Sequence, residues 1–180
     1  MSVTLVAGVA FAGAVIVADD PVGDAEAPPS LAPKAGSRSL DINGTTPGGD
    51  PWAVEISESQ TGKTCFFAGR VRDGKIGNVD ADGTFRERND APSETCGDLN
   101  AEPALVGATA QDGVVAIHGV AGESVVSVSI GGDRVALGPR GGFIGVRSGE
   151  SKDLPKWPVE VALKDGRQIV YPWTGPPETK

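Results

Sequence analysis

The sequence has few of the side chains that most catalytic centres use. Its 180 residues include one histidine, His118, and two cysteines that form no Cys-x-x-Cys pair. A hydrolytic triad needs a nucleophile, a base and an orienting acid, and no nucleophile-elbow motif accompanies the histidine. A lone histidine at a strand end is usually a hydrogen-bonded or partly exposed residue. We therefore expect no catalytic residue, no cofactor and a non-enzymatic protein.

Clusters of basic residues are also missing. The chain carries 16 Lys and Arg against 24 Asp and Glu, a net charge of −8, and its basic residues are scattered. Nucleic acids and anionic lipids are bound by concentrated positive charge. The composition thus argues against a nucleic-acid partner. It leaves an unidentified protein or glycan as the expected partner, and it leaves the oligomeric state open.

There is a single long uncharged run, from Val3 to Ala18, and neither Lys nor Arg precedes it. As a helix it would rise about 24 Å, less than the hydrocarbon core of about 30 Å, so it suits a signal peptide and is marginal as a membrane span. Small residues suited to cleavage lie at 12–14 and 16–18, and the absence of a following cysteine excludes a lipoprotein. We expect residues 1–18 to be a hydrophobic helix, either a cleaved signal peptide or a membrane anchor that contacts the bilayer through residues 3–18. Both alternatives place the protein outside the cytoplasm, secreted or membrane-anchored.

Residues 19–51 differ sharply in composition from the run before them. They hold six prolines and six acidic residues against two basic ones, with little aliphatic clustering. Such a segment buries too little apolar surface to offset its chain entropy. We expect a disordered, proline-rich acidic linker that acts as a spacer.

Period-two alternation recurs from Trp52 onward, and no window carries a long helical stripe. The pattern predicts an all-β domain over residues 52–173, an antiparallel β-sandwich of about eight or nine short strands, followed by a flexible tail over 174–180. The positions of the apolar residues in the last hairpin determine its register. A three-residue loop with Gly166 in a left-handed bulge pairs Val161 with Ile169 and Val159 with Tyr171, which keeps the apolar residues on one face.

Cys65 and Cys96 are an even pair behind an export segment, and we expect them to form one structural disulfide. Two other motifs are expected to be structural. Gly62-Lys63-Thr64 lacks the first glycine of a phosphate-binding loop and precedes a strand. The glycine-rich segment 138–143 is expected to be a connecting loop, with an interaction edge as the alternative.

The segment 78–83 matches the opening of a calcium loop, with oxygen-bearing side chains at Asn78, Asp80 and Asp82 and glycine at the sixth position. It ends at Asn89 where a bidentate glutamate is needed, and its flanks resemble strands. An Asp-Gly hairpin turn with solvated carboxylates is the competing interpretation, and calcium is kept as an alternative.

Several short motifs together resemble uncharacterised exported or membrane-anchored bacterial proteins. They are Pro51-Trp52-Ala53-Val54, Gly62-Lys63-Thr64-Cys65 with Gly69-Arg70-Val71, Asp73-Gly74-Lys75-Ile76-Gly77, Cys96-Gly97 and Gly142-Phe143. The resemblance implies a disulfide-pinned extracytoplasmic β-domain behind a hydrophobic segment, and it carries no activity.

The sequence as a whole predicts an extracytoplasmic, non-enzymatic binding or structural module of the cell envelope. Two alternatives stay open: a small extracellular hydrolase or carbohydrate-active accessory domain, and a calcium-stabilised adhesion-like domain.

Overall fold

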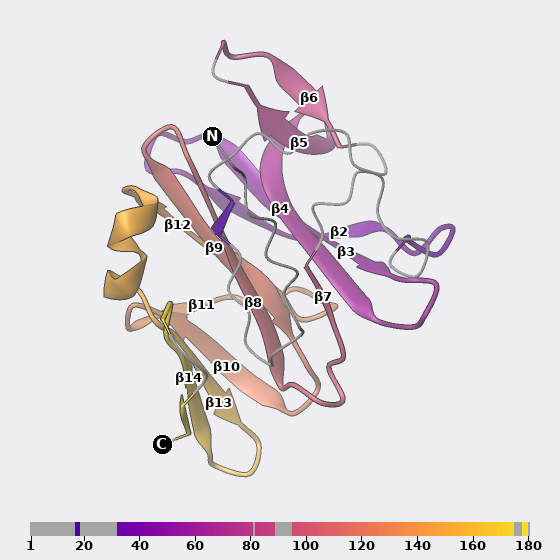
Figure 1. Cartoon of the computed structure of the whole chain (residues 1–180), viewed down its shortest axis with the longest axis vertical. Coiled ribbons are helices and arrows are strands. Elements are labelled where there is room, and N and C mark those ends of the chain that lie inside the picture. Colours follow the sequence, from indigo (N-terminus) through magenta and orange to yellow (C-terminus); the bar gives the residue numbers. More distant parts are fainter. Residues whose placement is uncertain (1–16, 19–31, 81, 89–94, 175–177, 180) are drawn as a thin grey trace, which may run out of the picture.

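Short strands joined by tight turns make up most of the protein, as the alternation predicts. A computed structural model describes residues 17–18, 32–80, 82–88, 95–174 and 178–179 (Figure 1). The Asp73-Gly74 and Asp112-Gly113 turns have positive φ at both residues, the geometry that suits a two-residue hairpin. The strands are β1 (Val17–Ala18), β2 (Ser39–Thr45), β3 (Pro51–Glu58), β4 (Thr64–Arg72), β5 (Lys75–Val79), β6 (Phe85–Glu87), β7 (Thr95–Gly97), β8 (Ala104–Gln111), β9 (Val114–Ala121), β10 (Val125–Ile130), β11 (Asp133–Val135), β12 (Gly142–Ser148), β13 (Val159–Leu163), β14 (Gln168–Tyr171) and β15 (Glu178–Thr179), with a 3-10 helix, η2, at Ser151–Lys156.

The strands form three sheets, which confirms the antiparallel all-β prediction with more strands than the eight or nine expected. The N-terminal sheet has the order β2-β3-β4-β5-β6, with β7 also paired to β4. The central sheet is β1-β8-β9-β12, and the C-terminal sheet is β11-β10-β13-β14-β15. Within these sheets β1 and β8 pair in parallel and the other pairings are antiparallel. Figure 1 shows the central sheet between the other two.

The central sheet is buried on both faces, and alternate residues of β9 enter two different cores. Val115 and Ile117 pack in the first core, with the C-terminal sheet, whereas Ala116 and Val120 pack in the second, with the N-terminal sheet. Side chains on a strand point alternately to opposite faces, so β9 serves both layers. The largest fully buried side chains are Phe143 in the first core and Trp52 and Phe66 in the second.

The N-terminal sheet also buries part of its outer face. Ala53, Phe67 and Ile76 form a small third cluster there. The guanidinium of Arg88 lies 4.0 Å from the centre of the Phe67 ring, and its Nε lies 3.4 Å from Glu55 Oε1. A buried charge is tolerated only with such partners, so this contact fixes the chain after β6 against the sheet.

The last hairpin has the predicted register. Val161 pairs with Ile169 and Val159 with Tyr171, and Gly166 has a φ of 88°. Gly166 N donates to Leu163 O across the three-residue loop. The apolar pattern thus excludes a two-residue turn, because that turn would split the apolar residues between the two faces.

The folded part begins earlier than predicted. Ser39–Thr45, placed by composition in a disordered linker over 19–51, is strand β2 and pairs with β3 from Ser39↔Ile56 to Thr45↔Pro51. Pro33 forms a bridge with Ser59, and Lys34 N donates to Glu58 O. The linker prediction is therefore wrong for this stretch, because backbone pairing with β3 compensates for its low hydrophobicity. Residues 19–31 lie outside the described part.

The two ends of the chain also differ from the predicted domain boundaries. Of the helix predicted for residues 1–18, the structure describes the last two residues, which form β1 and pair with Ala108 and Thr109 of β8. In the tail predicted to be flexible, Glu178 and Thr179 form β15 and pair with β14. In the part of the chain that the structure describes, there is no helix long and apolar enough to cross a membrane.

The glycine-rich loop between β11 and β12 is hydrogen-bonded to the N-terminal sheet. The Asp41 carboxylate of β2 accepts hydrogen bonds from Arg140 N at 2.8 Å and Gly142 N at 2.7 Å. A Cβ at Gly142 would lie 2.7 Å from Asp41 Oδ2, so only glycine permits this approach. Arg140 Nη1 adds bonds to Ser39 Oγ and Ile56 O. The segment is thus the connecting loop that we expected, and its glycines form a backbone cradle for a carboxylate.

Candidate functional site

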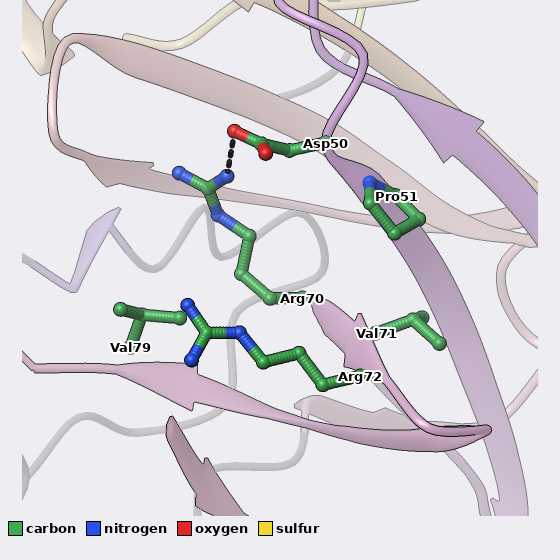
Figure 2. Close-up of a pocket in the computed structure, with 6 residues that line it drawn as sticks. All are labelled: Asp50, Pro51, Arg70, Val71, Arg72 and Val79. Carbon is green, nitrogen blue, oxygen red and sulfur yellow. Dashed lines mark hydrogen bonds and ion pairs between the residues drawn. The ribbon is translucent and has the colours of Figure 1, made fainter. Parts of the chain in front are cut away.

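An open pocket of about 260 Å³ lies at the edge of the N-terminal sheet, where β3 begins and β4 ends. Figure 2 shows two arginine side chains lying side by side in it. It is small compared with typical ligand pockets, so it would enclose one functional group or one ring and not a large ligand. Its lining residues are Asp50, Pro51, Arg70, Val71, Arg72 and Val79. We call this the two-arginine pocket.

Strand β4 places both arginines on the same side of the sheet. Arg70 and Arg72 are two residues apart, a spacing that puts side chains on one face at a separation of about 7 Å along the strand. Each guanidinium lies over an aromatic ring: Arg70 is 5.1 Å from the centre of Trp52, and Arg72 is 5.5 Å from the centre of Phe85. Stacking uses the flat face of a guanidinium and leaves the N–H donors at its edge available. The rings therefore hold the two cations in place without consuming their donors.

One carboxylate already lies in the pocket. Arg70 Nη1 donates to Asp50 Oδ2 at 2.7 Å. The Arg70 side chain is 12% exposed, whereas that of Asp50 is 64% exposed. Arg70 Nε is buried and has no hydrogen-bond partner among the described residues. Arg72 Nη1 makes a longer bond of 3.3 Å to Gly83 O. The pocket thus combines a well-packed cation with a loosely held anion.

The backbone beside the pocket is fixed. Thr46 N donates to Asp50 O at 2.9 Å, and Asp50 N donates to Thr46 Oγ1 at 2.9 Å. Across the pocket, Gln111 at the end of β8 donates from Nε2 to Val79 O. A side chain of the central sheet is therefore hydrogen-bonded to the end of β5 that lines the pocket. The Asp50 side chain projects from an ordered turn.

His118 lies away from this pocket, inside the second core. It is not at a strand end, as the sequence suggested, because β9 continues to Ala121. The residue is 5% exposed, its ring packs edge-on against Phe66 at 5.5 Å, and Thr109 Oγ1 shares a 3.3 Å hydrogen bond with its Nε2. Burial lowers the pKa of His118 to about 3, and its Nδ1 has no partner in the described chain. A neutral, enclosed imidazole of this kind does not reach solvent or the two arginines.

The predicted disulfide is confirmed. Cys65 and Cys96 are joined across the directly opposed positions of β4 and β7. Cys65 is fully buried. The bond closes a loop across 31 positions and attaches β7 to the half of β4 that β5 does not cover. Its position at a strand junction is that of a structural cross-link.

The three residues of the candidate calcium loop lie in a β-hairpin. Asn78 is in β5, and Asp80 follows it in the turn to β6. Arg86 Nε donates to Asp80 Oδ2 at 2.5 Å, and Asp82 Oδ1 accepts from Thr84 N at 2.9 Å. That backbone bond is the main cause of the lowered pKa of Asp82. These carboxylates hold the turn together, and among the described residues no group of three or more His, Cys, Asp or Glu side chains is placed to hold a metal.

The remaining sequence motifs are structural. Gly62 has a φ of 77° in the turn between β3 and β4, where Lys63 N donates to Ser59 Oγ at 3.0 Å. Arg147, the second arginine beside the glycine-rich loop, forms a 2.9 Å ion pair with Asp133. A second hollow of about 260 Å³ lies between the β7–β8 connection and the β13–β14 hairpin. It is lined by Leu99, Pro103, Leu163 and Ile169 with Ser124 and Arg167 beside them.

Sequence reasoning missed the two-arginine pocket. The basic residues were treated as scattered because no run of them occurs, yet Arg70-Val71-Arg72 has the period-two spacing that places two cations on one face of a strand. Asp50 was assigned to the linker, so its approach to β4 could not be foreseen. Comparison with protein-family models, with curated proteins and with solved structures finds no match to this chain.

Proposed function

We propose that the protein is an extracytoplasmic, non-enzymatic binding module of the cell envelope and that it contacts its partner at the two-arginine pocket. The observation that carries the proposal is the pair of stacked guanidiniums beside one open cavity. A guanidinium stays protonated at physiological pH and offers several directed N–H donors. Such groups suit recognition of an anionic group and not proton transfer.

The disulfide supports the proposed compartment. A cross-link between Cys65 and Cys96 persists in oxidising compartments and is rare in the cytosol. The uncharged run of residues 3–18 supports export in the same way. The proposed partner is therefore a protein or a glycan of the envelope.

The separation of His118 from the pocket supports a non-enzymatic role. General acid–base catalysis needs a group with a pKa near the working pH within hydrogen-bond reach of substrate. The pKa of His118, lowered by burial to about 3, and its enclosed position in the second core do not meet either condition.

The proposal is tested by co-sedimentation of residues 17–180 with isolated envelopes, because the uncharged run of residues 3–18 would carry the full chain into the pellet if it inserts in the bilayer. We expect the wild-type protein to sediment and Arg72→Gln to remain in the supernatant, because Arg72 is exposed enough to be replaced without unfolding β4. Asp133→Asn, which breaks an arginine–carboxylate pair elsewhere, is the matched control and should sediment like the wild type. Equal sedimentation of Arg72→Gln and wild type would contradict the pocket as the contact site. Release of a new soluble product from the envelopes, detected by mass spectrometry, would contradict the non-enzymatic role.

A further inference from the structure

We infer that the two-arginine pocket recognises a carboxylate and that Asp50 is an internal competitor which the incoming carboxylate displaces. This inference rests on the binding function proposed above and names the chemical group bound. The Asp50 carboxylate on Arg70 is the group whose place the ligand takes.

The Arg70–Asp50 ion pair is suited to exchange of the Asp50 carboxylate for another carboxylate. Ion pairs with an exposed partner contribute little to stability, because water and salt compete with them. The Asp50 side chain is 64% exposed, and the turn that begins at Thr46 holds its backbone but not its carboxylate. A change of side-chain rotamer is therefore enough to release Arg70 without unfolding.

Arg70 itself does not move with Asp50. Its side chain is 12% exposed and its guanidinium is stacked on Trp52, which is 1% exposed. Its buried Nε has no partner among the described residues. A cation that is already packed and oriented pays little ordering cost when a ligand arrives. The carboxylate site is thus pre-formed on the cation side.

Arg72 supplies the second cation. It lies on the same face of β4, over Phe85, and its 3.3 Å bond to Gly83 O occupies only one of its five donors. When Asp50 is displaced, the two guanidiniums face the incoming group together. The cavity of about 260 Å³ leaves space for a group about the size of one sugar ring behind the carboxylate.

The test is a titration of the full chain, followed by the nitrogen–proton NMR signals of the arginine Nε and tryptophan Nε1 groups. The probes are acetate, which presents the carboxylate alone, glucuronate, which presents it on a sugar ring, neutral methyl glucoside, and sulfate. We expect acetate and glucuronate to shift the Arg70, Arg72 and Trp52 signals with a dissociation constant of the order of millimolar, typical of one small charged group. Tighter binding of glucuronate would identify an acidic sugar as the source, and equal binding would identify a free carboxylate; both support the inference.

Three variants sharpen the test. Asp50→Asn should tighten acetate binding about five- to tenfold, because the competitor is removed, while Asp133→Asn should leave it unchanged. Arg72→Gln should weaken it about tenfold, and its dispersed amide spectrum would show that the fold is retained. Tighter binding in Asp50→Asn is the distinctive result, since loss of an acidic residue with a merely structural role would not produce it.

The inference is overturned if acetate shifts none of these signals at 50 mM (about ten times the expected constant), if Asp50→Asn does not tighten binding, or if sulfate binds as tightly as acetate. Such results would leave envelope binding through Arg72 standing, if Arg72→Gln still failed to sediment. Failure of the inference and failure of the proposed function are therefore distinguishable.

Discussion

The two faces of the central sheet build cores of different character. Toward the C-terminal sheet, Val115 and Ile117 of β9 meet Phe143, Val128 and Val161 in a cluster of apolar side chains. Toward the N-terminal sheet, the cluster with Trp52 and Phe66 lies against a buried histidine, and Trp52 also contacts Arg70 of the two-arginine pocket.

The two cores also differ in their buried polar atoms, which affect the free energy of unfolding. Buried polar atoms without a hydrogen bond cost free energy. Among the described residues, two such atoms, His118 Nδ1 and Trp52 Nε1, lie on the side of the N-terminal sheet, whereas one, Tyr171 Oη, lies in the first core. We interpret the first core as the stable foundation and the second as the layer that carries recognition. The predictions below test this contrast, in order of decreasing effect.

Truncation of one large ring in each core should reveal the contrast directly. Phe143 and Phe66 are 0% and 1% exposed, and replacing either by alanine should cost about 3–5 kcal/mol of unfolding free energy. We expect Phe143→Ala to be at the upper end of that range. The space left by Phe66 borders the polar His118 ring, which a water molecule can satisfy in part. Urea unfolding followed by circular dichroism measures both variants, and a larger loss for Phe66→Ala would reverse the interpretation.

Removal of the disulfide should weaken the N-terminal sheet selectively. For a loop that spans 31 positions, the double variant Cys65→Ala/Cys96→Ala should lose about 3–4 kcal/mol of unfolding free energy. Hydrogen exchange should rise most in β4 and β7, with β10 and β13 affected last. Wild-type protein reduced with dithiothreitol is the control and should behave like the double variant. Uniform loss of protection across all three sheets would show that the layers do not differ.

Acidification should also act through the second core. Burial holds the pKa of His118 at about 3, below the value of about 6.5 in an unfolded chain. The folded state therefore binds fewer protons than the unfolded state between these values. The free energy of unfolding is therefore unaffected by His118 above about pH 6.5 and falls as the pH falls from 6.5 toward 3. The loss amounts to about 2–3 kcal/mol at pH 4.5. His118→Leu should flatten this part of the stability curve, as measured by urea midpoints at several pH values. An unchanged slope in this variant would mean that other groups cause the pH dependence.

The link between the two layers should have the smallest effect. Asp41→Asn removes the charge that accepts hydrogen bonds from Arg140 N and Gly142 N, and it should cost about 1 kcal/mol. Asp165→Asn is the matched control, since Asp165 pairs with Arg167 inside one exposed loop, where water screens the ion pair, and should have a smaller effect than Asp41→Asn. Thermal unfolding measures both, and equal effects would show that the cradle around Asp41 is not a structural link.

Local pattern was sufficient to predict much of the sheet structure. The β13–β14 register follows from the parity of Val159, Val161, Ile169 and Tyr171, and the disulfide follows from the even cysteine count. Both depend on residues near one another in sequence or on a constraint that is independent of the fold.

Details of the pairing between strands that are distant in the chain could not be predicted from the sequence. Strict alternation along β10 would put Val126 on the face of Val128 and Ile130, but a register shift in the pairing between β10 and β13 puts Val125 in the core and leaves Val126 53% exposed. The sequence pattern also does not decide whether Trp157 and Trp173, which have prolines nearby, are core or surface residues. Both are partly buried against the first core, and Trp173 Nε1 donates to Trp157 O at 2.7 Å.

The candidate site could be predicted only in part. The spacing of Arg70 and Arg72 was readable as two cations on one strand face, but a search for basic runs does not detect it. The contact with Asp50 depends on the turn that leads β2 into β3, and β2 itself has the composition of a linker. A strand stabilised by a neighbour that lies later in the chain gives little signal of its own.

The early start of the fold has a practical consequence. Strand β3 is buried on both faces and is hydrogen-bonded along one side by β2. A chain cut at Trp52, where composition suggests that the domain begins, would leave a long apolar strand with an open row of backbone donors and acceptors. Such an edge pairs readily with other chains. Residues 39–45 thus protect the protein from self-association, and a soluble fragment should begin before Pro33.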